Sequence, residues 1–211
     1  MSKLSKGNIE KVMNALLAEY PDADCALNHK NVFELLVATV MSAQTTDASV
    51  NKVTPALFKK AGTAAKMAKM EPEQIEEYIH SIGMYKQKAK HLVELSKQLV
   101  ERFDGEVPQD FDALISLPGV GRKTANVVLS VGFGEQHIAV DTHVFRLANR
   151  IGLVDEENVL DTELTLMKIL PKEHWTEMHH ALIFHGRKIC NAKTPLCDKC
   201  CIKKLCKKNL L

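Results

Sequence analysis

Cysteines crowd together near the end of this sequence, at spacings typical of a metal-binding site. The pattern is C-x6-C-x2-C-x5-C, and it is formed by Cys190, Cys197, Cys200 and Cys206. Disulfides in a reducing compartment do not explain such crowding. Four thiolates this close can bind structural zinc or a [4Fe-4S] cluster. Cys201 offers an alternative register beside Cys200, and Cys25 is expected to be a buried thiol outside the site.

A glycine-rich turn is the second chemical feature of the sequence. Residues 117–125 read LPGVGRKTA and lie between two segments of helical pattern. Gly119 and Gly121 allow turn conformations closed to other residues and the close approach of a ligand. The first amides of the following helix lack intrahelical partners and can hold a DNA phosphate. The pattern therefore favours a DNA-binding helix-hairpin-helix over an ordinary glycine turn, and such a contact reads the DNA backbone without sequence specificity.

Lys123 follows this turn, in the first turn of the predicted helix. The positive end of a helix dipole disfavours an ammonium, and a partly desolvated amine there becomes a nucleophile. A simple charge contact with a phosphate is the alternative role. Eighteen residues further on, Asp141 stands where an N-cap residue would be, before another helical pattern. Capping alone would be a sufficient structural reason for this aspartate.

Helical spacing of apolar residues dominates the chain, and alternating strand-like runs are scarce, so we predict an all-α fold. The N-terminal helix is marked by Ile9, Val12, Met13, Leu16 and Leu17, and a later one by Leu160, Leu164, Met167 and Leu170. Further helices are expected over about 31–42, 47–60, 72–79, 85–103, 109–116, 123–132, 142–151 and 175–189. Residues 31–42 are apolar on every side, which predicts a buried central helix.

The charge is unevenly distributed along the chain. The formal net charge is +2, but residues 187–208 contain eight Lys or Arg and one acid, which gives this segment +7 and the remainder −5. Such asymmetry makes nucleic acid the first candidate partner. No stretch approaches the roughly 20 apolar residues of a membrane helix, and the start of the chain lacks the apolar core of a secretory signal. We therefore expect a cytoplasmic protein that associates with the nucleoid through DNA and does not bind membranes.

Together, LPGVGRKTANVVL and the following IAVDTHVFRLANR closely resemble the endonuclease III family, within the helix-hairpin-helix DNA glycosylase superfamily. The resemblance extends over nearly the whole chain. It implies a base-excision glycosylase that removes oxidised pyrimidines from double-stranded DNA and also cleaves abasic sites. In that family the lysine at Lys123 attacks the sugar C1′, and the aspartate at Asp141 activates the amine and stabilises positive charge on the sugar. A Schiff base on the lysine then permits β-elimination on the 3′ side.

The resemblance implies further DNA contacts. A damaged nucleotide must leave the duplex before a side chain can reach its C1′. Gln44 and Met84 match the two loops that fill the gap, although leucine is usual at the second position and a core role for Met84 is equally open. Gly119, Gly121, Arg122 and Lys193 are the expected backbone contacts. Asp47 and His143 are possible supports of the active site, although Asp47 could simply cap a helix.

The resemblance also implies an architecture and a cofactor. It implies two helical domains, 22–135 with the hairpin and 1–21 plus 136–211 with the cysteines. DNA would lie in a cleft between them, with Lys123 and Asp141 facing each other. The cysteine spacing matches that of the family, which implies one [4Fe-4S] cluster per chain, with zinc as the alternative. The protein is expected to act as a monomer. The cluster is expected to be structural and to shape the loop that carries Lys193.

Two other functions share parts of this pattern. An adenine-mismatch glycosylase has the turn and the cysteines, but Lys123 and the end of the chain at Leu211 argue against it. A non-catalytic helix-hairpin-helix module would need neither the Lys123–Asp141 pair nor the cysteines. His179, His180 and His185 precede the cysteines on one helix but form no HExxH motif, so packing or solvent exposure is expected of them.

Overall fold

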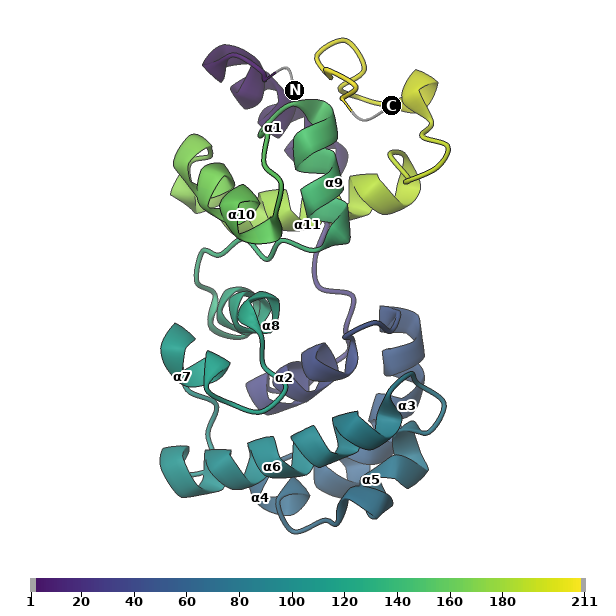
Figure 1. Ribbon diagram of the computed structural model, residues 1–211, viewed down its shortest axis with the longest axis vertical. Coiled ribbons are helices and arrows are strands. Elements are labelled where there is room, and N and C mark those ends of the chain that lie inside the picture. Colours follow the sequence, from purple (N-terminus) through teal and green to yellow (C-terminus); the bar gives the residue numbers. More distant parts are fainter. Residues whose placement is uncertain (1–2, 210–211) are drawn as a thin grey trace. The chain divides into compact units, whose positions relative to one another are not determined.

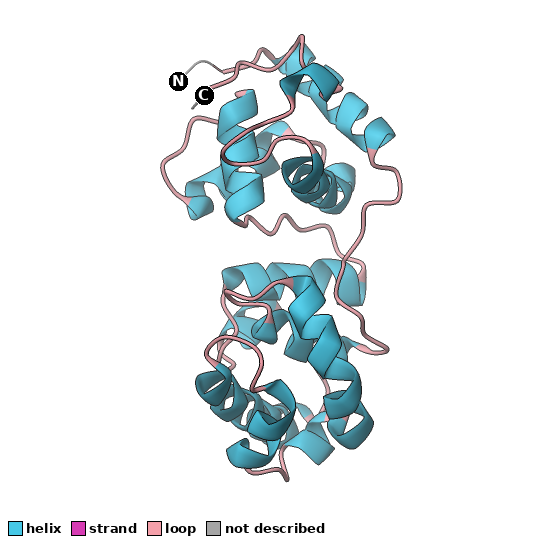
Figure 2. Ribbon diagram, turned by 90° about the vertical axis from the view of Figure 1, so that its right-hand side faces the viewer, coloured by secondary structure: helices cyan, strands magenta, loops and turns pink. Residues whose placement is uncertain are grey.

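The computed structural model describes residues 3–209, and these residues form helices and loops with no strand among them (Figure 2). The prediction of an all-α fold is thus confirmed. No helix within residues 3–209 has the length and apolar character needed to cross a membrane. The chain forms two compact units: Ala26–Gly134, here called the hairpin unit, and Met1–Cys25 with Glu135–Leu211, here called the cysteine unit. Residues 1–2 and 210–211, which the predicted 1–21 and 136–211 spans include, lie outside the described residues.

The hairpin unit contains seven of the α-helices labelled in Figure 1. They are α2 (Val32–Met41), α3 (Asp47–Ala61), α4 (Ala64–Met67), α5 (Pro72–Ile79), α6 (Tyr85–Phe103), α7 (Phe111–Ile115) and α8 (Arg122–Val127). The predicted 31–42 helix is α2, and every residue from Phe33 to Met41 is buried, as its uniformly apolar sequence indicates. Asn31 caps this helix by accepting the Glu34 amide at 2.8 Å.

The predicted helix over 123–132 has two parts in the structure. After α8 the chain continues as a π-helical segment, Val128–Gly132. At Gly132 a side-chain Cβ would lie 2.9 Å from Cγ1 of Val32, so only glycine lets this segment come so close to α2. Helix α8 and the π-helical segment that follows it therefore pack against α2, the buried central helix of this unit.

Within residues 3–25 and 135–209, the cysteine unit contains four further α-helices and two short 3₁₀ turns. They are α1 (Lys6–Glu19), α9 (Thr142–Ile151), α10 (Val159–Ile169) and α11 (Trp175–Lys188), with turns at Lys172–His174 and Cys197–Lys199. Helix α11 packs against both α1 and α9 (Figure 1). Buried apolar side chains such as Leu16, Leu147 and Leu182 form their shared core.

Candidate active site and cysteine cavity

The turn between α7 and α8 has the geometry of a hairpin in which Gly119 carries the reversal. Gly119 has φ +76°, a conformation that L side chains rarely adopt. A Cβ there would lie 3.1 Å from Nδ1 of His91 and 3.2 Å from Cγ1 of Val40. Only glycine therefore satisfies both the backbone conformation and the packing of this turn.

Gly121 differs from the sequence expectation. Its backbone is extended, with φ −97° and ψ 175°, which any residue can adopt, and a Cβ would meet no atom within 4 Å. The prediction that Gly121 needs a glycine-only conformation is wrong. As the N-cap residue of α8 it supplies no side-chain cap, and the space beside the first amides of this helix stays open.

Lys123 lies in the first turn of α8 and is exposed, so the expected partial desolvation of its amine is not a property of this structure. Arg122 is also exposed, and its guanidinium carbon lies 4.8 Å from the centre of the Phe111 ring of α7. This cation–π contact joins the two helices of the hairpin. Water can reach the Lys123 amine from outside the unit, and so can a ligand.

Asp141 belongs to the cysteine unit and caps α9. Its Oδ1 accepts the backbone N–H groups of His143 and Val144, both at 2.8 Å. The structural role expected of this residue is therefore present. His143 is half-buried, with Nδ1 3.3 Å from Nη2 of Arg146. Asp141 and Arg146 also interact electrostatically, and their attraction partly opposes the burial that lowers the pKa of Arg146.

The two loops expected to fill a gap in DNA lie in the hairpin unit. Gln44 and Met84 both have left-handed backbones, with φ 53° and 57°, and both are exposed. Met84 is 53% exposed, which excludes a core role. Asp47 does not cap α3, because Thr46 is the N-cap and its Oγ1 accepts the Ser49 amide at 3.2 Å.

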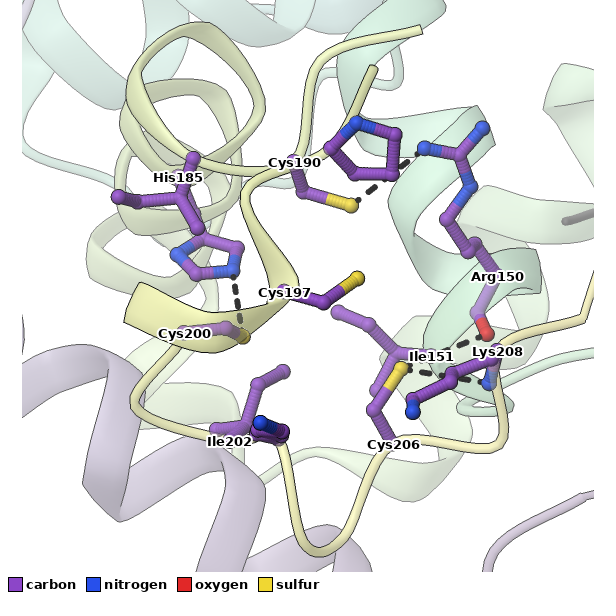
Figure 3. A pocket seen from close by; sticks show the side chains of 12 residues that line it. Arg150, Ile151, His185, Cys190, Cys197, Cys200, Ile202, Cys206 and Lys208 are labelled. Carbon is purple, nitrogen blue, oxygen red and sulfur yellow. Dashed lines mark hydrogen bonds between the residues drawn. The ribbon is translucent and has the colours of Figure 1, made fainter. Parts of the chain in front are cut away.

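The four patterned cysteines line one cavity in the cysteine unit. Figure 3 shows the sulfurs of Cys190, Cys197 and Cys206 directed into the same space, while that of Cys200 lies against His185. Cys201 is exposed and does not line the cavity. Four thiols around one cavity are the donor set that an iron–sulfur cluster uses, so the residues fit such a group.

Hydrogen-bond donors lie beside two of the sulfurs. Nη1 of Arg150 lies 3.6 Å from Sγ of Cys190, and the backbone N–H of Lys208 lies 3.3 Å from Sγ of Cys206. Such donors stabilise thiolate ligands when a metal is bound. Among residues 3–209, no three His, Cys, Asp or Glu side chains are grouped closely enough to hold a single metal ion.

His185, for which the sequence predicted only packing or solvent exposure, also lines the cavity. It is 1% exposed, its Nε2 lies 3.4 Å from Sγ of Cys200, and its Nδ1 lies 2.9 Å from the Tyr20 hydroxyl of the N-terminal segment. Burial lowers the pKa of His185 to about 4, so the ring carries one proton at neutral pH. His179 and His180 are also buried, so of the two roles expected for them, packing and solvent exposure, the structure supports packing.

Without a bound metal, the cavity favours neutral thiols. Burial is the main cause that raises the pKa of Cys200 to about 11, and burial also raises the pKa of Cys206. Cys25 is only half-buried, so the expectation of a buried thiol at this position is wrong. Its backbone N–H donates to Oδ1 of Asp24 at 2.6 Å.

The basic loop after Cys190 is fixed by the same arginine that reaches the sulfur of this cysteine. Arg150 donates to the carbonyl oxygens of Asn191 at 2.8 Å and Ala192 at 3.2 Å. The Asn191 side chain in turn accepts the Thr194 amide at 2.7 Å. Between these anchors, Lys193 is exposed.

The fold and the hairpin define the class of protein. Residues 37–172 match the HhH-GPD superfamily of base excision DNA repair proteins. Endonuclease III of Bacillus subtilis is 47% identical over 205 residues, which cover 97% of this chain and 94% of that protein. Endonuclease III of Escherichia coli K12 is 44% identical over 203 residues, 96% of each chain. This chain belongs to the endonuclease III family, and it is a base-excision DNA glycosylase with lyase activity.

Solved structures agree with this assignment. A trapped covalent intermediate of an endonuclease III with DNA superposes with a TM-score of 0.93 at 48% identity, covering 97% of both chains. A thermostable thymine-DNA glycosylase has a TM-score of 0.85 at 23% identity, over 96% of both chains, a likeness that concerns the fold.

Proposed function

We propose that this glycosylase removes oxidised pyrimidines from double-stranded DNA and that Lys123 is its nucleophile. The observation that carries the proposal is the exposed Lys123 amine in the first turn of the hairpin helix, beside open backbone amides. Those amides and the exposed Arg122 would hold the DNA backbone, which brings the amine to a flipped nucleotide. Bound DNA would also supply the desolvation that the free amine lacks.

In the proposed reaction, the Lys123 nitrogen forms a bond to C1′ as the bond between C1′ and the base breaks. The sugar ring opens to a Schiff base, loss of a proton from C2′ follows, and the 3′ phosphate leaves. Asp141 accepts a proton from the amine and stabilises positive charge on the sugar. Its Oδ1 is engaged by two backbone amides, so we assign the proton transfer to Oδ2. The proposal requires DNA to be bound by both units.

Gln44 and Met84 are the proposed residues that fill the gap left by the flipped nucleotide. Both are exposed on loops of the same unit, as an inserted side chain must be. Lys193 is the proposed DNA contact of the cysteine unit. His143, beside Asp141, and Asp47 are proposed supports. We further propose that the protein acts as a monomer on nucleoid DNA in the cytoplasm.

We also propose one [4Fe-4S] cluster per chain, held by Cys190, Cys197, Cys200 and Cys206. In support, the four thiols line one cavity without converging on a point, which suits ligands shared among several metal atoms better than one zinc ion. When bound, the cluster would cross-link the C-terminal loop and perform no step of the reaction. Metal analysis tests this assignment, because iron with sulfide supports it and stoichiometric zinc contradicts it.

The nucleophile is tested with duplex DNA that contains one thymine glycol. Borohydride reduction should give a covalent protein–DNA adduct with the wild-type protein and none with Lys123→Ala. Lys123→Arg keeps the charge but is no nucleophile at neutral pH, so it should bind DNA without forming the adduct. An adduct in either variant would show that another residue attacks. An adduct with abasic DNA alone would point to a different lesion.

A further inference from the structure

Beneath the two loops that carry Gln44 and Met84 lies a buried cation that the proposed reaction does not use. Lys88, in the first part of α6, is 5% exposed, and burial lowers its pKa. A buried ammonium is costly unless it is paired, and its place near a helix N-terminus adds to the cost. Its Nζ donates to a neutral group, the Thr45 hydroxyl, at 2.8 Å. Such a placement calls for a compensating role.

The contacts of Lys88 connect both loops. Its Nζ donates to Oγ1 of Thr45, and the Thr45 hydroxyl in turn donates to the Ala43 carbonyl at 3.4 Å, so this chain of bonds brackets Gln44. On the other side, the backbone N–H of Lys88 donates to the Met84 carbonyl at 3.0 Å. One residue thus ties the 43–45 loop to Met84, the residue just before α6.

Both tied residues have strained backbones. Gln44 and Met84 are two of the four non-glycine residues with positive φ in the described chain. Such conformations are costly and persist only where the surroundings fix them. The loops also lie against each other, because a Cβ on Gly83 would be 4.0 Å from the Gln44 carbonyl oxygen. A link that fixes one loop therefore affects the other.

We propose that Lys88 is a positioning residue that, through Thr45, holds Gln44 and Met84 together in the conformation that enters DNA. This inference rests on the proposed function, since it assumes that both residues fill the gap. It predicts a defect only where a nucleotide must leave a duplex. Single-stranded DNA with an abasic site needs no such insertion, yet its aldehyde can still react with Lys123.

The test compares borohydride trapping on duplex and single-stranded abasic DNA of one sequence. Lys88→Met and Thr45→Val should each slow trapping on the duplex about tenfold, which is the size expected from the release of one strained residue. Both should trap single-stranded DNA at the wild-type rate. Thr45→Ser keeps the hydroxyl and is the matched control, so it should behave as wild type on both substrates.

A double variant separates this link from general loss of structure. If Thr45 acts through Lys88, Thr45→Val should add nothing to the duplex defect of Lys88→Met. Thermal melting identifies a variant that fails to fold, in which case the Thr45→Val and Thr45→Ser pair decides alone. An unchanged duplex-to-single-strand ratio in folded Lys88→Met or Thr45→Val, or a serine variant as defective as the valine variant, overturns the inference.

Failure of the underlying function gives different results. A wild-type protein that traps neither substrate would refute the role of Lys123. Normal duplex trapping by Gln44→Ala and Met84→Ala would refute insertion by these residues, and the role of Lys88 would be refuted with it. A duplex defect in those two variants, with Lys88→Met normal, refutes the positioning role alone.

Discussion

Asp141 combines a helix cap with a proposed chemical role, and the two can be separated by substitution. Its Oδ1 accepts two backbone N–H groups, and its charge lies at the positive end of α9. Loss of such a cap costs about 0.5–2 kcal/mol, and two bonds at 2.8 Å place this one near 1.5 kcal/mol. The dipole contribution of the charge alone is about 0.5 kcal/mol.

Asp141→Asn keeps the accepting oxygen and loses the charge, whereas Asp141→Ala loses both. We expect the asparagine variant to lose about 0.5 kcal/mol of unfolding free energy and the alanine variant about 1.5–2 kcal/mol. Both should slow base release about 10²-fold, because neither has a carboxylate to accept the proton. Urea titration gives the first quantity, and single-turnover base release from thymine glycol duplex gives the second.

Asn158 provides the matched control, because it caps α10 in the same unit by accepting the Asp161 amide at 2.9 Å. Asn158→Ala should cost about 1 kcal/mol and leave base release unchanged. If Asp141→Asn lost as much stability as Asp141→Ala, the capping geometry would be wrong. Base release at the wild-type rate in Asp141→Asn would refute the role of its charge.

Three further predictions concern the hairpin, a buried histidine and the cysteines. Gly119→Ala should lower the free energy of unfolding by about 1–3 kcal/mol, because it puts a Cβ on a residue with a left-handed backbone. Gly121→Ala should leave stability unchanged but weaken DNA binding. Thermal melting measures the first effect and DNA-binding titrations measure the second. Burial lowers the pKa of His180, so as pH falls this histidine is protonated in the unfolded chain before it is protonated in the folded protein. The free energy of unfolding should therefore decrease as pH drops below about 6.5. In urea titrations at pH 7 and 5, His180→Phe should reduce this loss of stability. Cys200→Ser should lose bound iron, which Cys201→Ser should retain, by metal analysis.

Features with a strong local signal could be predicted from the sequence. The apolar run of α2, the long pattern of α6 and the glycine turn each depend on residues that are neighbours in the chain. Helix α4 was missed because its four residues are too few to show a period. The π-helical segment was missed because its apolar residues continue the pattern of α8. The need for glycine at 132 depends on Val32, a hundred positions earlier in the chain.

The candidate site shows the same division. The hairpin, the cap at Asp141 and the cysteine spacing are all local patterns. His185 and Tyr20 approach the cavity only through the packing of α11 on α1, so no spacing reveals them. Lys88 lies on a mostly polar helix, where a lysine normally indicates a solvent-exposed position. Its hydrogen-bond partner Thr45 lies 43 positions away in the sequence.

Helix α9 relates the cysteine cavity to the candidate carboxylate. Asp141 is its N-cap, and Arg150 lies near its other end, about 14 Å along the axis at 1.5 Å per residue. Arg150 bonds the sulfur of Cys190 and two carbonyls of the loop with Lys193, and Arg146, one turn earlier, donates to the Cys190 carbonyl at 3.0 Å. Because a helix is stiff over this length, a cluster bound by the four cysteines would also fix the position of the Lys193 loop relative to Asp141. A structural cluster could thus affect DNA binding and base release without entering the chemistry.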